Sequence, residues 1–260
     1  MKFAITPCPN DTFSYFAAIN GKLENCPFEF VFDDIEGLNL SAKKGEYEIT
    51  KMSFAAFLEN SSRYELLDAG AALGIGTGPV LVGRGGAAFD ASKPVAVPGL
   101  NTTAALLLRF YCGGKSSELD LRPMYFRDIA DCVSKGLDGV DFGVLIHEGR
   151  FVYESLGLSL LCDLGGYWTQ KTSLPVPLGC ICIRRDMLAR KAEVEAQIRK
   201  SIKYGFDNFE QTLPYVRSMA QYLGDDVLRR HIFAFVNDYS LDISQIKQKL
   251  TENLLKCRNR

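Results

Sequence analysis

Short apolar runs alternate with helix-like segments through the first two thirds of the chain. We expect strands at residues 3–6, 28–34, 47–53, 79–85, 93–99, 124–129, 140–146, 158–164 and 178–185. We expect helices at 10–20, 38–44, 54–60, 101–111 and 130–135, followed by four helical segments to the end. This alternation predicts an α/β fold in which parallel or mixed sheets carry helices on both faces.

Two interruptions divide the alternation. The first is Gly83-Arg84-Gly85-Gly86, and the second is the segment TSLPVPLG at 172–179, which contains two prolines. Two crossings imply that the middle segment forms one lobe and that the first and last segments complete the other. We therefore predict a discontinuous lobe 1 of residues 1–86 and 179–260, and a lobe 2 of residues 87–178. This is the layout of a two-lobed binding-protein fold with a ligand cleft between the lobes.

Composition narrows the class of protein. The 260 residues are 47% hydrophobic and carry a formal net charge of −1, which suits one large domain or two lobes. Scattered Lys and Arg give no basic stripe, so we expect no nucleic-acid partner. No apolar run approaches transmembrane length, and MKFAIT lacks the apolar core of a secretion signal, so we predict a cytoplasmic protein without membrane contact.

Eight cysteines are present, and none forms a C-x-x-C pair. They are Cys8, Cys26, Cys112, Cys132, Cys162, Cys180, Cys182 and Cys257. Most lie in apolar patterns, so we expect reduced, buried thiols. Alternation along a strand puts Cys180 and Cys182 on one face, but no histidine nearby in sequence completes a zinc set. We predict no metal.

Polar residues lie just after the first expected strand and at the end of the third. Asn10 and Asp11 can cap the next helix, or the amides of that helix N-terminus can hold polar substrate groups. Lys51 and Ser53 point to the same side of their strand by alternation. Lys51 can pair with a substrate carboxylate, with a hydrogen bond from Ser53, or it can be an ordinary solvated lysine.

The segment VPGLNTTAALLL at 97–108 joins a strand, a Pro-Gly turn and an apolar helix. Thr102 and Thr103 bring hydroxyls and unbonded amides together, which predicts either a carboxylate cradle or a plain helix cap. The segment GIGTGP at 74–79 is not a dinucleotide-binding motif, because a strand is expected after it rather than a helix. We expect a flexible loop there that lines the cleft.

One of only two histidines, His147, follows the apolar run of VDFGVLIHEGR at 140–150. It lies where a strand ends and a loop begins, the edge at which open α/β sheets bind ligands. No nucleophile motif accompanies it, so it acts as a general base or has a structural role only. An imidazole with an ordinary pKa near 6.5 is available as a base at neutral pH. His231 lies within a late helix, and we expect it to be structural.

Seven motifs together resemble a known enzyme family. They are PCPNDTF, TKMSFAAF, GIGTGP, VAVPGLNTTA, LIHEGRFVYE, DLGGYW and LPVPLG, in this order. Their order and spacing resemble the 1,4-dihydroxy-6-naphthoate synthases of the futalosine pathway of menaquinone biosynthesis. The resemblance runs from about residue 3 to beyond residue 184 and continues more loosely to the end.

The resemblance implies a two-lobed, periplasmic-binding-protein-like fold of type II that serves as an enzyme. It implies a lyase that cleaves cyclic dehypoxanthinylfutalosinate to 1,4-dihydroxy-6-naphthoate and dihydroxyacetone. It implies that His147 is the base, that Lys51-Met52-Ser53 and Thr102-Thr103 bind substrate, and that no metal or organic cofactor is needed. Together with Asn10 and Asp11, these residues are our predicted site for a small-molecule carboxylate substrate.

Two other functions remain open from the sequence. A solute-binding protein of the same architecture would bind a small molecule without chemistry. The related chorismate dehydratase has a similar fold but, in the comparison of motifs, lacks the LIHEGRF block. Turnover of chorismate would favour the dehydratase, and ligand binding without turnover would favour the solute-binding protein. We expect a monomer or a homodimer.

Overall fold

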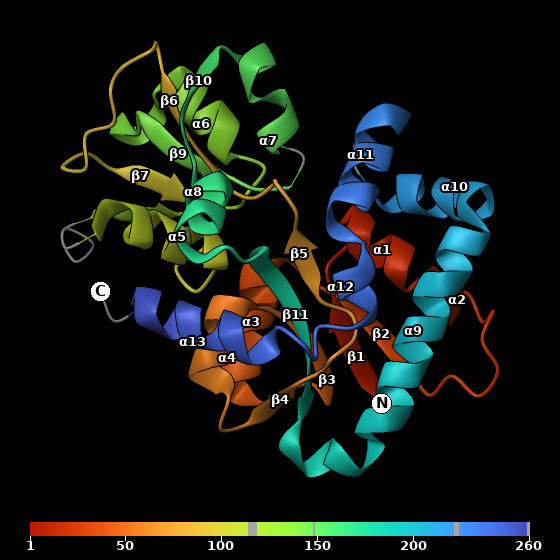
Figure 1. The fold of residues 1–260 in the computed structure, drawn as a ribbon. Coiled ribbons are helices and arrows are strands. Elements are labelled where there is room, and N and C mark those ends of the chain that lie inside the picture. Colours follow the sequence, from red (N-terminus) through yellow and green to blue (C-terminus); the bar gives the residue numbers. More distant parts are fainter. Residues whose placement is uncertain (114–118, 148, 221–223, 259–260) are drawn as a thin grey trace. The chain divides into compact units, whose positions relative to one another are not determined.

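The computed structural model describes residues 1–113, 119–147, 149–220 and 224–258 (Figure 1). The chain divides into two compact units. Unit 1 consists of Met1–Leu73 and Pro177–Lys249, and unit 2 consists of Gly74–Val176 and Leu250–Arg260. The chain therefore passes from one unit to the other three times, after Leu73, after Val176 and after Lys249. The predicted lobe limits, at 86 and 178, stay a prediction.

Unit 1 is built on a mixed sheet. Its strands are β1 (Lys2–Ile5), β2 (Glu29–Phe32), β3 (Ile49–Ser53), β4 (Tyr64–Leu66), β5 (Ala72–Gly74) and β11 (Val176–Arg184), the last two reaching the unit boundary. The order is β2-β1-β3-β11-β4, and β5 also pairs with β11. Strand β1 is parallel to β2 and β3, whereas β11 returns from unit 2 and is antiparallel to β3 and β4. The late strand thus makes the sheet mixed.

Helices cover both faces of this sheet. They are α1 (Pro9–Ser14), α2 (Phe16–Ile19), α3 (Ile35–Lys44), α4 (Phe54–Asn60), α9 (Lys191–Asp207), α10 (Phe209–Met219), α11 (Asp225–Phe235) and α12 (Asp238–Leu241). Helices α1, α2 and α9 to α11 pack together on one side, and α3 and α4 on the other (Figure 1). A further helix, α13 (Lys247–Arg258), crosses the unit boundary.

Unit 2 contains a second mixed sheet. Its strands are β6 (Val80–Arg84), β7 (Val95–Val97), β8 (Leu121–Pro123), β9 (Phe142–Leu145) and β10 (Leu158–Asp163), in the order β10-β6-β9-β7-β8. Its α-helices are α5 (Thr103–Cys112), α6 (Ile129–Lys135), α7 (Gly149–Val152) and α8 (Leu164–Thr172). Strand β7 is parallel to β8 and β9, and β6 is antiparallel to β9 and β10.

Most predicted elements are present, and the α/β prediction with mixed sheets is confirmed. The strand expected at 124–129 is wrong: β8 ends at Pro123, and the next regular element, α6, begins at Ile129. The helix expected at 10–20 is two short helices, because the backbone leaves the helical region at Tyr15, where φ is −106° and ψ is 9°.

Each unit has its own hydrophobic core. In unit 1 the inward face of β1 supplies Phe3 and Ile5, which pack with Phe13 of α1 and with Ile198 and Ile202 of α9. Alternation along β6 likewise buries Val80 and Val82 in unit 2, against Ile129 and Val133 of α6. The 3.6-residue repeat along α9 and the two-residue repeat along the strands put these side chains on one face of each element.

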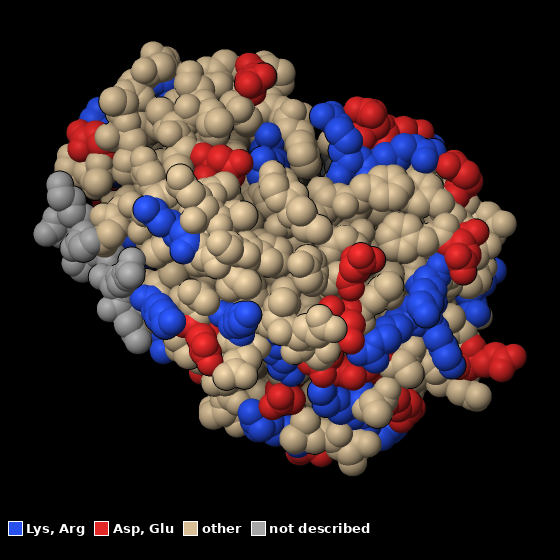
Figure 2. Space-filling view, viewed as in Figure 1, with Lys and Arg blue, Asp and Glu red and all other residues tan. Residues whose placement is uncertain are grey.

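Charge is dispersed over the surface. On the face drawn in Figure 2, described Lys and Arg side chains lie among Asp and Glu rather than in a stripe of one sign. None of the helices in the described part of the chain is long and apolar enough to span a bilayer.

Asp68 joins α9 and the start of α13 to the loop after β4. Its carboxylate accepts from Lys191 Nζ at 2.9 Å and from Lys247 Nζ at 3.1 Å, and its backbone N–H donates to Glu195 at 2.8 Å. Burial alone would raise the pKa of Asp68. The hydrogen bonds from the two lysines, with their charges, outweigh burial and lower this pKa below its ordinary value of 3.8.

We expect Asp68 to contribute stability at neutral pH that is lost in acid. Because the pKa is depressed in the folded state, the contribution is full above the ordinary pKa and declines as pH falls through the folded pKa. Urea unfolding should show Asp68→Asn less stable than the parent by about 1 kcal/mol at pH 7, since the pairs are partly solvated. The gap should close in acid, and a gap independent of pH would contradict this role. The control is Asp207→Asn, at an exposed residue that ends α9.

Candidate active site

The first polar segment enters helix α1 rather than capping it. The N-cap is Cys8, Pro9 occupies the first helical turn, and Asn10 and Asp11 lie inside the helix. The prediction that Asn10 or Asp11 caps the helix is therefore wrong. Proline favours the first helical position, because its fixed φ suits the helix and its missing N–H is not needed there. The cap therefore lies two residues before Asn10 and three before Asp11.

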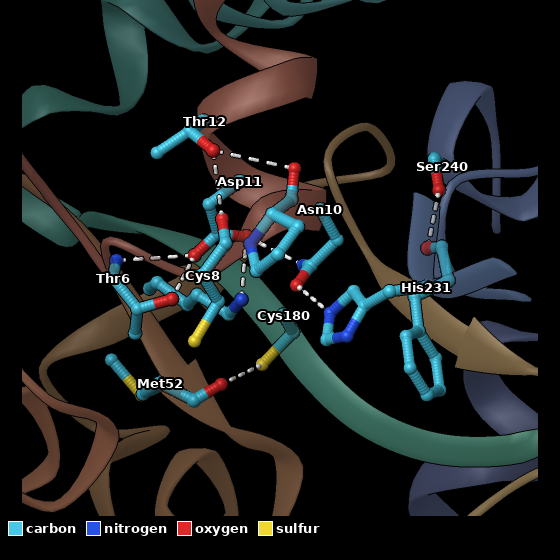
Figure 3. Close-up of polar contacts among 12 residues, drawn as sticks. Thr6, Cys8, Asn10, Asp11, Thr12, Met52, Cys180, His231 and Ser240 are labelled. Carbon is cyan, nitrogen blue, oxygen red and sulfur yellow. Dashed lines mark hydrogen bonds and ion pairs between the residues drawn. The ribbon is translucent and has the colours of Figure 1, made fainter. Parts of the chain in front are cut away.

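Asp11 is the centre of a buried polar network (Figure 3). Its Oδ2 accepts from the backbone N–H of Thr6 at 3.1 Å and from Thr6 Oγ1 at 2.6 Å. Its Oδ1 accepts from Asn10 Nδ2 at 2.8 Å and from Lys51 Nζ at 2.5 Å. Four donors fill the approximately four lone-pair sites of a carboxylate. The side chain is fixed from both sides, at the carboxyl end of β1.

Lys51 is buried, with only 4% of its surface exposed. The solvated-lysine alternative is therefore wrong. Within the described residues its ammonium group donates one hydrogen bond, to Asp11, and two N–H groups remain for a ligand or water. The stem of Lys51 passes Gly179 of β11 so closely that a Cβ there would lie 2.9 Å from Lys51 Cε. Glycine at this position leaves room for the lysine.

The other residues of this segment are also held by buried contacts. The backbone N–H of Ser53 donates to Asn39 Oδ1 at 2.9 Å, and Asn39 Nδ2 donates to Ser53 Oγ at 3.2 Å. Met52 is fully buried, and its carbonyl accepts from Cys180 Sγ at 3.5 Å. The sequence interpretation missed Asn39. The available signal was a polar residue on the otherwise apolar inner face of α3, beside Ile35, Leu38 and Ala42.

The cysteines are free thiols, of which five are buried and three are partly exposed. Cys180 and Cys182 lie on one face of β11 as predicted, with their sulfur atoms 3.8 Å apart. Burial, then the neighbouring Cys180, raises the pKa of Cys182 well above its ordinary value, so this thiol stays protonated. Among the described residues, no group of three or more His, Cys, Asp or Glu side chains is placed to hold a metal ion.

His147 lies in unit 2, two residues after the end of β9. Its φ of 52° is in the left-handed region, which few residues other than glycine adopt, and the carbonyl of Ile146 accepts from Gly149 N–H at 3.1 Å across the turn. The imidazole meets the ring of Phe126 edge to face, with centroids 5.1 Å apart. Strained backbone of this kind concentrates at functional sites. Glu148 lies outside the described residues.

Arg150 ties this turn to the rest of unit 2. Its Nη1 donates to the carbonyl of Gly78, and its Nη2 lies 3.6 Å from Asp163 Oδ2. Asp163 is the N-cap of α8 and accepts from Gly166 N–H at 2.9 Å. The segment 74–79 leads from β5 into strand β6, as the sequence predicts. Arg150 thus joins the histidine turn, this glycine-rich loop and α8.

The two threonines have different positions at the start of α5. Thr102 is the N-cap: its Oγ1 accepts from Ala105 N–H at 3.2 Å and donates to the carbonyl of Gly99 at 2.8 Å. Thr103 is the first helical residue and is buried. Thr102 therefore caps the helix, and a binding role for Thr102 and Thr103 stays a prediction. The structure brings Asn10, Asp11 and Lys51 together in unit 1, while the threonines and His147 belong to unit 2.

The comparison with known proteins covers almost the whole chain. A family model described as menaquinone biosynthesis matches residues 1–259. The chain is 38% identical over 258 residues to a 1,4-dihydroxy-6-naphtoate synthase of Thermus thermophilus, covering 98% of this chain and 92% of the relative. It is 35% identical over 254 residues to the enzyme of the same name from Streptomyces coelicolor, covering 94% and 88%.

Solved structures agree with the fold. A protein of Archaeoglobus fulgidus, AF1704, matches with a TM-score of 0.92 and 33% identity over 99% of this chain and 96% of that one. The ligand-binding component of an ABC-type import system from Staphylococcus aureus matches with a TM-score of 0.71 at 13% identity, covering 100% and 91%. The second likeness concerns the fold alone, and it confirms the predicted periplasmic-binding-protein-like architecture.

Proposed function

The chain belongs to the menaquinone-biosynthesis family, and from this premise we propose that it is a lyase that makes 1,4-dihydroxy-6-naphthoate. The proposed substrate is cyclic dehypoxanthinylfutalosinate, and the second product is dihydroxyacetone. The observation that carries the proposal is the similarity to two enzymes named 1,4-dihydroxy-6-naphtoate synthase. They are 38% and 35% identical to this chain over nearly its full length. We further propose that it acts in the cytoplasm, as a monomer or homodimer, without a metal or organic cofactor.

We propose that His147 is the general base. Cleavage of a carbon–carbon bond beside a ring that becomes aromatic needs one proton to leave from a defined carbon, and a neutral imidazole can accept it. Three features support this role: the left-handed backbone, the ring contact with Phe126, and a position at the end of a sheet strand.

The proposed substrate-binding residues belong to both units. In unit 2, Thr103 and the first amides of α5 supply donors for an anion beside the capping Thr102. In unit 1, the ammonium group of Lys51 pairs with Asp11, and its two remaining N–H groups can donate to the substrate carboxylate. Met52 and Ser53 follow it on the same strand. Asn10 and Asp11 complete this set by fixing the lysine.

Product analysis tests the function. The purified protein is incubated with cyclic dehypoxanthinylfutalosinate, with chorismate, and with neither, and products are identified by mass spectrometry. Naphthoate and dihydroxyacetone in equal amounts support the proposal. Dehydration of chorismate would assign the related dehydratase instead, and binding of the futalosine derivative without turnover would assign a solute-binding protein.

Replacing Arg150 should slow the reaction. In Arg150→Met the turn that carries His147 loses its links to Gly78 and Asp163. We expect kcat to fall roughly tenfold to a hundredfold, because small displacements of a catalytic group are costly. Arg150→Lys keeps the charge but not the planar fork, so it should recover only part of the rate. Steady-state kinetics at matched thermal stability measures this, and an unchanged kcat in the methionine variant would contradict it.

A further inference from the structure

His231 lies at one end of a buried hydrogen-bond chain whose other end is Lys51. We propose that His231 is a positioning residue for Lys51 and acts through Asn10 and Asp11. This inference rests on the substrate-binding function proposed for Lys51.

The hydrogen-bond chain joins three elements that are far apart in sequence. His231, on α11, is completely buried, and its Nε2 lies 3.1 Å from Asn10 Oδ1 on α1 (Figure 3). Asn10 Nδ2 donates to Asp11 Oδ1 at 2.8 Å, and the same oxygen accepts from Lys51 Nζ of β3 at 2.5 Å. All four residues are at most 4% exposed, so bulk water does not compete for these bonds.

The chemistry of the groups fixes the direction of the chain. An ionised carboxylate can only accept, so the amide of Asn10 must turn its NH₂ toward Asp11. The amide oxygen then faces His231 and can only accept. The Nε2 atom of His231 must therefore carry a hydrogen, which fixes either the Nε2–H tautomer or the cation.

Loss of this donor has a consequence for Lys51. Without an N–H from residue 231, the amide oxygen of Asn10 is buried without a hydrogen-bond donor. If the amide instead rotates, the oxygen turns toward the carboxylate of Asp11. Two acceptors would then face each other, and the carboxylate that fixes the Lys51 ammonium group would loosen. Because the change reaches the proposed carboxylate-binding group, it should weaken substrate binding more than it slows the chemical step.

Three single variants separate the hydrogen bond that residue 231 donates from the packing of its side chain. His231→Leu removes the donor, His231→Gln keeps an N–H at a similar reach, and Phe235→Leu removes the edge-to-face ring contact with the same imidazole at 4.9 Å. We expect KM to rise about tenfold in His231→Leu, with kcat within threefold of the parent. His231→Gln and Phe235→Leu should stay within about threefold of the parent KM. Equal KM values in His231→Leu and the parent, or a glutamine variant as impaired as leucine, would overturn the proposal.

A double variant tests whether the effect passes through Asn10. Asn10→Leu alone should raise KM by a similar factor, and adding His231→Leu should raise it little further, because both remove the same link. Additive effects would show that His231 acts by another route. All variants are compared at temperatures where circular dichroism shows them folded.

Nitrogen NMR tests the chain without turnover. With only two histidines, ¹⁵N-histidine labelling and a His147 variant assign both rings. We expect His231 Nε2 to be protonated in the parent and its shift to change in Asn10→Leu. A deprotonated Nε2 would overturn the proposed direction of the chain. If the parent protein made no naphthoate, the proposed function would fail, while the NMR result would still decide the hydrogen-bond chain.

Discussion

Replacement of His147 by Gln should lower kcat by about 10² to 10⁴, the usual contribution of a positioned general base. Glutamine retains polarity and similar reach but cannot accept a proton near neutral pH. Substrate affinity, measured by isothermal titration under conditions without turnover, should change little, because a base contributes mainly in the transition state. The reaction is followed by formation of the naphthoate.

The backbone at this position needs its own control. Since φ of His147 is 52°, His147→Asn tolerates the left-handed conformation and also lacks a suitable base. It should be as inactive as His147→Gln. Retention of more than about a tenth of kcat in both variants would mean that another group removes the proton.

Replacement of Lys51 by Met should lower the free energy of unfolding by roughly 3–5 kcal/mol, because Asp11 would keep a charge in a buried site without its ion-pair partner. Both side chains of this pair are only 5% exposed. Urea unfolding followed by circular dichroism measures the change. In the folded variant we also expect a raised KM for the substrate.

A double variant distinguishes loss of the pair from loss of packing. Asp11→Asn combined with Lys51→Met removes both charges, so it should recover a large part of the lost stability. The exposed i,i+4 pair of Asp131 and Lys135 provides the control, since Lys135→Met should have little effect. If the double variant were as unstable as the sum of the singles, the charge explanation for Lys51 would be wrong.

Family membership could be predicted from the sequence because the seven motifs occupy continuous stretches in a fixed order. The buried polar sites could not. From the sequence, Lys51 could be a solvated or a buried side chain, because the residues around a lysine at a strand end do not distinguish the two. Asn39 escaped notice for a similar reason: its partner Ser53 belongs to another element. The cap at Asn10 or Asp11 was wrong because Pro9 starts the helix earlier.

The sequence by itself determined the α/β alternation and most of the elements, since side-chain periodicity acts over a few residues. Only the tertiary structure decided the antiparallel insertion of β11 into the first sheet, because its pairing partners lie far away in the chain. The tertiary structure alone also decided which residues form the buried polar network around Asp11. Lys51 and Asp11 are 40 residues apart, and His231 and Asn10 are 221 apart. A buried charge requires partners from whatever segments the fold brings together, and no local pattern specifies them.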